Sequence, residues 1–286
     1  MVNVEGHQEG AVKGYNPKKL GNNCYNIQFA FCDELKAYIT GLVRSGNTYT
    51  SNGAAEMIKE IMSYLKDEGL EITFRMDSGY FDDDILETIE SYGCTYVIKG
   101  KEYPTLVAQV TDPSVVFVTG EEGRETTELT TALNTWKEAR RFVVSRVLKP
   151  AKDRSQMSFL EGSDFEYFYF VTNTKLPSEK VVIAYEKRGN AENYIKEAKY
   201  DMADGHLLLQ SFWANEAIFQ LMMLAYNLFL LFKMDFANGT EYRQQIKTFR
   251  LKYIFLAGKI IRTARSVIMR LSEKYPYREI YEQSLP

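Results

Sequence analysis

The feature that most constrains the fold is a pair of neighbouring strand-like runs followed by alternating strand and helix patterns. Residues 25–32 and 36–43 are strand-like, and the polar pair Asp33-Glu34 between them predicts a hairpin turn. Apolar positions from Ala54 to Leu65 follow the helical period, and Ser51-Asn52 is the expected N-terminal cap. A strand at 71–76, a helix at 82–92 and a strand at 95–99 follow. This order predicts a mixed α/β sheet.

The pattern changes after residue 100. Residues 115–119, 141–147 and 165–172 are strand-like and separated by polar turns, which predicts a β-rich insertion. Helical patterns return at about 178–201, 211–232 and 242–274. We therefore expect the first part of a core domain at residues 1–100, the insertion at 101–180, and core helices with basic C-terminal helices at 181–286.

The composition excludes several classes of protein. The 286 residues are 45% hydrophobic and 26% charged, as in an ordinary globular domain. Three cysteines without paired spacing and two histidines make a zinc site improbable and fit a reducing cytoplasm. The apolar run 217–232 is interrupted by Gln220 and Asn227, and suits a buried helix better than a membrane span. No signal peptide opens the chain, so we expect a soluble, cytoplasmic protein without a membrane partner.

The charge distribution is uneven. The net charge is −3, yet residues 241–274 carry nine basic side chains against Glu241 and Glu273. The basic residues are Arg243, Lys247, Arg250, Lys252, Lys259, Arg262, Arg265, Arg270 and Lys274. Such a block can attract a polyanion although the whole chain is slightly acidic.

The most informative segment is residues 185–199, YEKRGNAENYIKEAK. Tyr185, Arg188, Glu192 and Lys199 are spaced by three, four and seven positions, which places all four on one face of an α-helix. A carboxylate flanked by cations suits metal-assisted phosphoryl transfer. A solvated helix face with salt bridges accounts for the charge pattern equally well.

The spacing Y-x2-R-x3-E-x6-K resembles the YREK motif of bacterial insertion-sequence DDE transposases. Two other stretches agree in order: FRMDSGYFDDDIL resembles the second-aspartate motif, with Asp77 in the aspartate position, and GHQEGAVKGYNPKKLGNNCYNIQFAF resembles a stretch of one branch of these enzymes. That branch carries a β-rich insertion between the second aspartate and the glutamate. Together with DMADGHLLLQSFWANEAIFQLMMLAYNLF, which resembles the helix after the motif, the resemblance covers essentially the whole chain.

The resemblance implies a ribonuclease-H-like fold and a metal-dependent enzyme. Asp77 and Glu192 would be catalytic carboxylates that hold Mg²⁺ or Mn²⁺, since hard oxygen ligands suit these ions. Tyr185, Arg188 and Lys199 would contact DNA near the transposon end. The enzyme would act as an endonuclease at terminal inverted repeats and join the freed ends to target DNA, as a homo-oligomer in the nucleoid of a bacterial cytoplasm. Taken alone, Asp77 after a strand would more readily be interpreted as organising a turn or a helix start.

From the basic block we expect further DNA contacts. The side chains singled out are Arg250, Lys259, Arg262 and Arg265. Phosphate contacts of this kind hold DNA without reading its sequence.

The first catalytic aspartate of the family has no counterpart. It would lie a few residues before the QEGA stretch, but no aspartate precedes Asp33, which lies in the expected hairpin turn, and neither Glu5 nor Glu9 matches the motif position. We therefore expect an N-terminally truncated copy that is inactive alone. The alternative is a catalytically dead DNA-binding remnant that would inhibit intact transposase. A nuclease or integrase outside transposition is a rival with the same fold, whereas a purely structural α/β protein leaves the motif unexplained.

Overall fold

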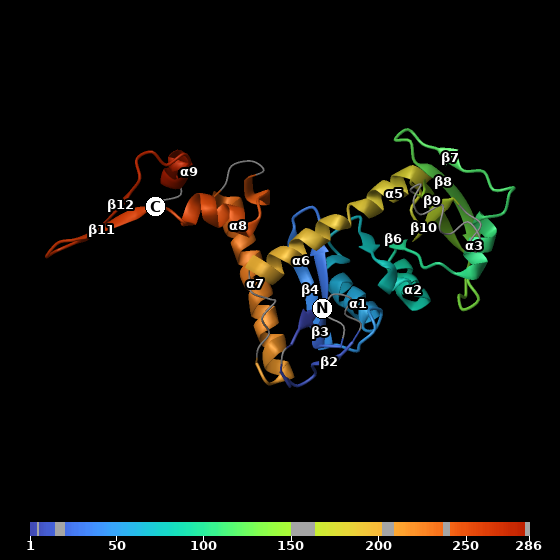
Figure 1. The fold of residues 1–286 in the computed structure, drawn as a ribbon, viewed down its shortest axis with the longest axis horizontal. Coiled ribbons are helices and arrows are strands. Elements are labelled where there is room, and N and C mark those ends of the chain that lie inside the picture. The colour runs from blue at the N-terminus through green and yellow to red at the C-terminus, as the bar shows by residue number, and fades with distance from the viewer. Residues whose placement is uncertain (5, 15–20, 150–163, 202–208, 237–240, 284–286) are drawn as a thin grey trace. The chain divides into compact units, whose positions relative to one another are not determined.

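The structure is a computed structural model that describes residues 1–286 except 5, 15–20, 150–163, 202–208, 237–240 and 284–286 (Figure 1). The chain forms two compact units. The first combines Met1–Asn47 with Ala191–Pro286, and the second is Thr48–Asn190. Because residues 15–20 are not described, the GYNPKK part of the QEGA-containing stretch lies largely outside the described residues.

The first unit is built on a four-stranded sheet. Its strands are β1 (Val2–Asn3), β2 (Val12–Lys13), β3 (Asn23–Cys32) and β4 (Ala37–Ser45), and β3 pairs antiparallel with the other three. The turn between β3 and β4 ends at Lys36, whose φ of 59° is left-handed. The predicted hairpin with Asp33-Glu34 in its turn is confirmed.

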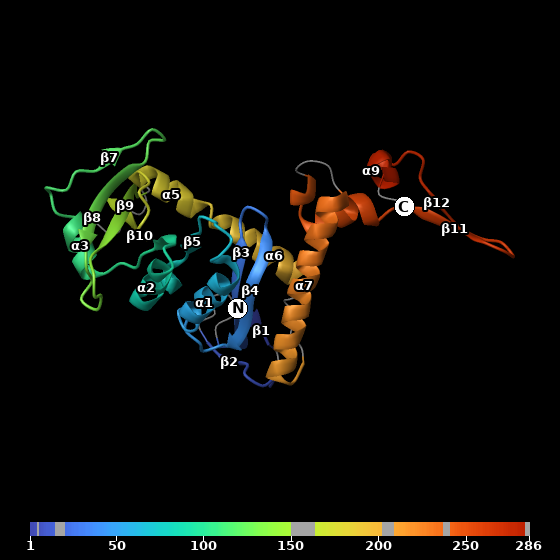
Figure 2. The ribbon, with the colours of Figure 1, turned by 180° about the vertical axis from the view of Figure 1, so that it is seen from behind.

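Helix α7 (Phe212–Phe236) packs on this sheet in the first unit (Figures 1 and 2). Phe219, Met223 and Tyr226 are buried in a cluster that includes Tyr25 and Tyr38 of the sheet. Glu216 accepts a hydrogen bond from the backbone N–H of Val43 at 2.6 Å. The predicted helix at 211–232 is confirmed, and its polar residues serve the packing of the helix on the sheet.

The stretch Phe212–Asp235 is long and apolar enough to cross a membrane, although only 28% of its most apolar window is buried. A helix that packs in the core of a protein can be equally long and apolar. Asn227 is one of the two polar residues that interrupt the apolar run, and it pairs with the backbone of Tyr38, accepting from its N–H at 2.9 Å and donating to its carbonyl at 2.8 Å. These bonds favour a helix that belongs to the sheet.

The C-terminal part of the first unit differs from the sequence prediction. After η2 (Glu241–Arg243), α8 (Ile246–Phe249) and η3 (Arg250–Ile254), the chain forms an antiparallel hairpin of β11 (Gly258–Arg262) and β12 (Val267–Leu271), followed by α9 (Arg278–Gln283). The expectation of one helix over 242–274 is wrong. Pairs of β-branched residues, Ile260-Ile261 and Val267-Ile268, favour strands over a helix at these positions.

The second unit contains a six-stranded mixed sheet in the order β5-β6-β10-β9-β8-β7. Its strands are β5 (Thr73–Met76), β6 (Thr95–Lys99), β7 (Val118–Thr119), β8 (Glu125–Thr131), β9 (Arg140–Leu148) and β10 (Phe165–Thr172). Only β5 and β6 are parallel, and the other neighbours are antiparallel. The predicted α/β class with a mixed sheet and a β-rich middle segment is confirmed.

The helices of the second unit are α1 (Ala54–Leu65), α2 (Asp83–Ser91), α3 (Pro104–Val110) and α5 (Ser178–Glu186), with a short 3₁₀ turn η1 (Ser78–Tyr80). The predicted cap of α1 is wrong, because Gly53 occupies the N-cap with a left-handed φ of 76° and no side-chain bond. Helix α3 was not predicted from the sequence pattern. β10 pairs directly with β6, so the strands of the expected insertion continue the sheet. The domain limits at residues 100 and 180 stay a prediction.

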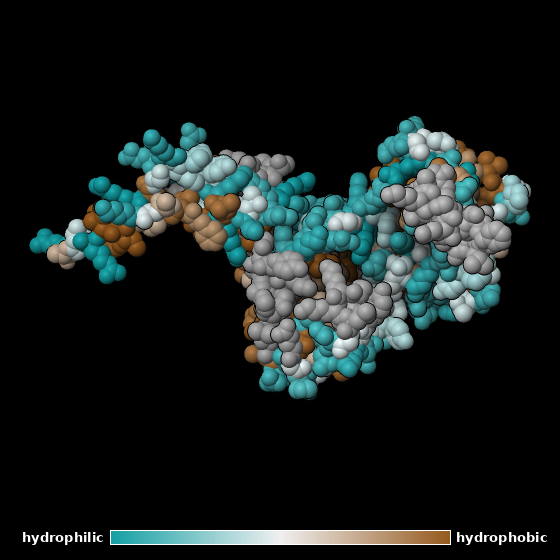
Figure 3. Space-filling model, viewed as in Figure 1, coloured by the Kyte–Doolittle hydropathy of each residue, from teal (hydrophilic) through white to brown (hydrophobic). Residues whose placement is uncertain are grey.

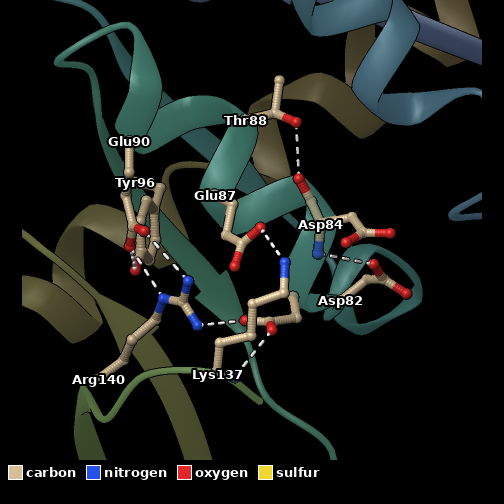
Figure 4. A network of polar contacts seen from close by, with 9 residues as sticks. Asp82, Asp84, Glu87, Thr88, Glu90, Tyr96, Lys137 and Arg140 are labelled. Carbon is tan, nitrogen blue, oxygen red and sulfur yellow. Dashed lines mark hydrogen bonds and ion pairs between the residues drawn. The ribbon is translucent and has the colours of Figure 1, made fainter. Parts of the chain in front are cut away.

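A buried ion-pair network holds α2 against β9 in the second unit (Figure 4). The guanidinium of Arg140 donates to Asp83 at 2.5 Å and to Glu90 at 2.9 Å, and its side chain is only 4% exposed. The Tyr96 hydroxyl also donates to Glu90 at 2.7 Å. Burial opposes the charge of Arg140, but the hydrogen bonds to Glu90 and Asp83 keep its pKa above the ordinary value. This cation is therefore fully paired inside the unit.

Removing one side of a buried pair leaves the other charge without compensation. We expect Arg140→Met to lower the free energy of unfolding by about 3–5 kcal/mol, measured by urea denaturation. Lys137→Met is the matched control. Lys137 also pairs with a residue of α2, Glu87, but the Lys137 side chain is 67% exposed. The control should leave stability almost unchanged. Equal losses for the two variants would contradict a structural role for the network.

Candidate metal and nucleic-acid site

Asp77 lies immediately after β5 and begins the turn η1. Its Oδ1 accepts a hydrogen bond from the backbone N–H of Gly79 at 2.9 Å, as the N-cap of that turn. The turn-organising interpretation of this aspartate is thus confirmed. The second carboxylate oxygen remains for another partner, and the side chain is 37% exposed.

That second partner is Arg188. Its Nη2 lies 2.9 Å from Oδ2 of Asp77, and the Arg188 side chain is 26% exposed. The two residues are 111 positions apart in the chain, and both were singled out from different sequence motifs. The structure therefore brings together the candidate second aspartate and the arginine of the four-residue motif.

The topology of the second unit explains this meeting. Thr172 at the end of β10 pairs with Val97 in the middle of the antiparallel β6, so β10 runs toward the start of β6 and the chain leaves the sheet at the end of the strands opposite Asp77. Asn173 holds this exit by donating to the Cys94 carbonyl and accepting from the Tyr96 N–H, both at 2.9 Å. Helix α5 then runs back over β6, β8, β9 and β10. Nine helical residues span about 13 Å, roughly the length of β6, and return the chain to the edge of Asp77.

Helix α5 is fixed by apolar packing on the sheet. Val181 and Val182 are buried in a cluster with Val97, Val143 and Phe170. The Tyr185 ring lies against Phe170, with 4.9 Å between ring centroids. Tyr185, expected to contact DNA, therefore also anchors the last turn of α5 beside Arg188.

The four motif residues do not share one continuous helix. Helix α5 ends at Glu186, and α6 (Gly189–Asp201) begins after a turn that contains Arg188. The expectation that all four project from one helix face is wrong, and Gly189, a poor helix former, marks the break. Glu192 is exposed in the first turn of α6. The side chain of Lys199 lies outside the described residues.

Glu192 belongs to the first unit and Asp77 to the second. The predicted approach of the two carboxylates to one ion therefore stays a prediction. Among the residues that the structure describes, no three His, Cys, Asp or Glu side chains gather closely enough to hold a metal ion. The carboxylate oxygens of Asp77 and Glu192 nevertheless have the donor chemistry that Mg²⁺ and Mn²⁺ prefer.

The basic block lies partly on the β11–β12 hairpin. Lys259 is directly opposite Arg270 on one face of this ribbon, and Arg262 is opposite Val267 on the other. Arg265 lies in the turn, which is closed by hydrogen bonds between Thr263 and Ser266. All four cations are exposed, and no acidic residue occurs between Gly258 and Leu271. Arg250 lies outside the ribbon, with its guanidinium 5.7 Å from the ring centre of Phe229.

The ribbon also exposes apolar side chains. Ile260, Val267 and Met269 share the face that carries Arg262, and they are 63%, 70% and 60% exposed. Figure 3 shows hydrophobic surface beside hydrophilic surface on the ribbon. Arg270 belongs to the basic block but was not among the DNA contacts expected from the sequence, because only strand pairing places it beside Lys259.

Residues 2–286 match the family model described as Transposase DDE domain group 1, so the chain belongs to this family. DDE transposases generally use divalent metal ions. No curated protein matches the chain. Among solved structures, the chain is similar to the piggyBac transposase in a cryo-EM structure of its synaptic complex with hairpin DNA, with 13% identity and a TM-score of 0.49. The match covers 82% of this chain and 46% of the other, so this chain spans less than half of that transposase.

The turn after β5 leaves no room for a side chain at Gly79. A Cβ there would lie 2.7 Å from Cγ2 of Thr50 and 3.0 Å from Oδ1 of Asp77. We expect Gly79→Ala to lower the free energy of unfolding by about 1–3 kcal/mol, measured by urea denaturation. Gly189→Ala is the control, since a Cβ at Gly189 meets nothing within 4 Å.

A double-mutant cycle locates the clash. Gly79→Ala should cost less when Thr50→Gly has already removed the Thr50 side chain. If the losses of stability caused by Gly79→Ala and Thr50→Gly are additive in the double variant, the contact with Thr50 does not determine the stability of the turn.

Proposed function

We propose that this chain is the catalytic domain of a DDE transposase of the insertion-sequence type, with a ribonuclease-H-like fold and the YREK arrangement of residues. One observation carries the proposal: Asp77 at the end of β5 is paired with Arg188 of the four-residue motif, in a chain that matches the DDE family from residue 2 to 286. Two motifs found independently in the sequence thus converge on one place in the second unit.

In this proposal Asp77 and Glu192 hold Mg²⁺ or Mn²⁺. There such an ion would supply the positive charge that lowers the pKa of an attacking water or 3′-hydroxyl and stabilises the leaving oxygen. Arg188 and Lys199 bind phosphates near the transposon end, and Tyr185 holds the end of α5 in position through its ring contact with Phe170. Asp77 keeps its orientation through the Gly79 N–H, which fixes one carboxylate oxygen.

The proposed substrates are the terminal inverted repeats of an insertion sequence and its target DNA, in the nucleoid of a bacterial cytoplasm. The enzyme works as an endonuclease and strand-transferase, as a homo-oligomer on paired ends. The β11–β12 hairpin supports a DNA partner because it combines four exposed cations with the shape of a two-stranded ribbon, which the major groove admits.

A second candidate is a DNA-binding remnant without catalysis, which would inhibit intact transposase by occupying its DNA. It is supported by the hairpin, whose cations Lys259, Arg262, Arg265 and Arg270 lie on an element separate from Asp77. Such a remnant would bind DNA with or without Asp77, whereas a transposase needs both DNA binding and catalysis.

The hairpin cations should give DNA binding a strong salt dependence. For each phosphate neutralised, log K falls by about 0.9 per log unit of salt. We expect replacement of Lys259, Arg262, Arg265 and Arg270 by Gln to weaken duplex binding and to flatten this slope by up to about 3–4, measured by fluorescence anisotropy.

The control changes the same amount of charge elsewhere. Gln at Lys59, Lys66, Lys101 and Lys175, four exposed lysines of the second unit, should leave the slope almost unchanged. Equal effects of the two quadruple variants would show that binding follows net charge and not the hairpin.

Catalysis should depend on Asp77 and Glu192. Asp77→Asn retains the acceptor for the Gly79 N–H, and its ion pair is partly exposed, so we expect stability to fall by no more than about 1 kcal/mol. However slowly this chain cleaves inverted-repeat DNA with Mg²⁺ or Mn²⁺, Asp77→Asn and Glu192→Gln should each abolish that cleavage.

The 286 residues hold only two carboxylates at the motif positions. We therefore expect only slow cleavage by this polypeptide. Robust cleavage by the 286-residue chain, abolished by Asp77→Ala, would show that the first carboxylate lies elsewhere within it. Complete absence of cleavage together with intact DNA binding would favour the remnant.

A further inference from the structure

Both carboxylate oxygens of Asp77 have a partner in the second unit. Oδ1 accepts from the Gly79 N–H and Oδ2 accepts from Arg188, each at 2.9 Å. We propose that Arg188 is a latch: it occupies the metal-binding oxygen of Asp77 until DNA phosphate draws its guanidinium away. The inference rests on the proposed function, because it requires that Asp77 binds a divalent ion and that the chain binds DNA.

Competition follows from charge and geometry. A divalent ion binds a carboxylate oxygen at roughly 2.0–2.6 Å, which places it where the Arg188 guanidinium now lies. The two cations also repel each other, so the Arg188–Asp77 pair lowers the affinity of Asp77 for a metal ion. The other carboxylate oxygen, Oδ1, already accepts a hydrogen bond from the Gly79 N–H.

The latch is weak enough to open. Arg188 and Asp77 are 26% and 37% exposed, and ion pairs of such exposure contribute little to stability. A DNA phosphate offers the guanidinium two parallel hydrogen bonds and is therefore a strong competitor for Arg188. Release of Arg188 then leaves Oδ2 of Asp77 available to the metal.

The position of Arg188 suits this exchange. It follows the last turn of α5, which Tyr185 and Val182 anchor on the sheet, and it precedes Gly189 at the start of α6. A long side chain on an anchored turn can exchange partners without movement of the sheet. The metal site would thus form when DNA is bound, which limits metal-dependent cleavage to the complex.

Coupling of this kind is reciprocal. If DNA raises the affinity for the metal by a factor, the metal raises the affinity for DNA by the same factor. Arg188 has opposite effects on the two ligands: it lowers metal affinity in the free chain and supports DNA binding. Loss of Arg188 should therefore raise metal affinity without DNA and reduce the coupling.

The test is a titration of the full chain with Mn²⁺, in which free Mn²⁺ is measured by electron paramagnetic resonance, with and without duplex DNA. In the unmodified chain we expect DNA to raise the Mn²⁺ affinity. Arg188→Gln should raise the affinity without DNA by about two- to fivefold, and DNA should then add little. Arg188→Lys keeps the charge but loses the planar donors, and should lie between the two.

The matched control is Arg124→Gln. Arg124 pairs at 2.7 Å with Glu186, the last residue of α5, with side-chain exposures of 33% and 50%, but it forms no ion pair with Asp77. This variant removes one positive charge from the second unit and should bind Mn²⁺ like the unmodified chain. A rise equal to that of Arg188→Gln would show a general charge effect and overturn the latch.

The outcomes separate the latch from the proposed function. Mn²⁺ binding that is lost in Asp77→Asn, but is equal in the unmodified chain and in both Arg188 variants, would overturn the latch and leave the metal site standing. Mn²⁺ binding that is unchanged by Asp77→Asn would overturn the metal site itself. Circular dichroism of each variant checks that the fold is retained, and Arg188→Lys supplies the test if Arg188→Gln unfolds.

Discussion

The packing of α5 across the sheet of the second unit governs the placement of the candidate site. β10 ends at the end of the strands opposite Asp77, so the chain must run back over the sheet before Arg188 can reach that carboxylate. The buried Val181 and Val182 set the path of the crossing, and their contacts with Val97, Val143 and Phe170 hold it. An ion pair between residues 111 positions apart is thus a consequence of apolar packing, and the pair itself contributes little to stability.

Two interpretations of Asp77 turn out to be compatible. One oxygen organises the turn after β5, as an aspartate at a strand end often does, and the other is held by a cation of the candidate motif. A carboxylate fixed in this way keeps its direction when its second partner changes. A turn-forming role therefore supports the proposed metal role, because an ordered ligand loses less conformational entropy on binding an ion.

Much of the fold could be predicted from the sequence because its strands are strongly patterned. Residues 165–172 coincide with β10, and the β3–β4 hairpin follows directly from two apolar runs around Asp33-Glu34. The β11–β12 hairpin was missed because a dense run of cations and apolar residues fits helical spacing as well as strand alternation. The break before Gly189 was missed for a related reason: spacing by three, four and seven predicts a shared face only if the helix is continuous. Pairing of Asp77 with Arg188 depends on long-range topology, which local periodicity does not encode.

The central claim is that Asp77 and Glu192 bind the same divalent ion. A crystal structure of the chain in complex with duplex DNA, grown with Mn²⁺ so that the ion is located by its anomalous scattering, tests it most directly. The account predicts an anomalous peak at roughly 2.0–2.6 Å from a carboxylate oxygen of both residues, with Arg188 displaced from Asp77. A peak that contacts neither carboxylate, or two carboxylates that bind separate ions far apart while the Arg188–Asp77 pair persists, would contradict it.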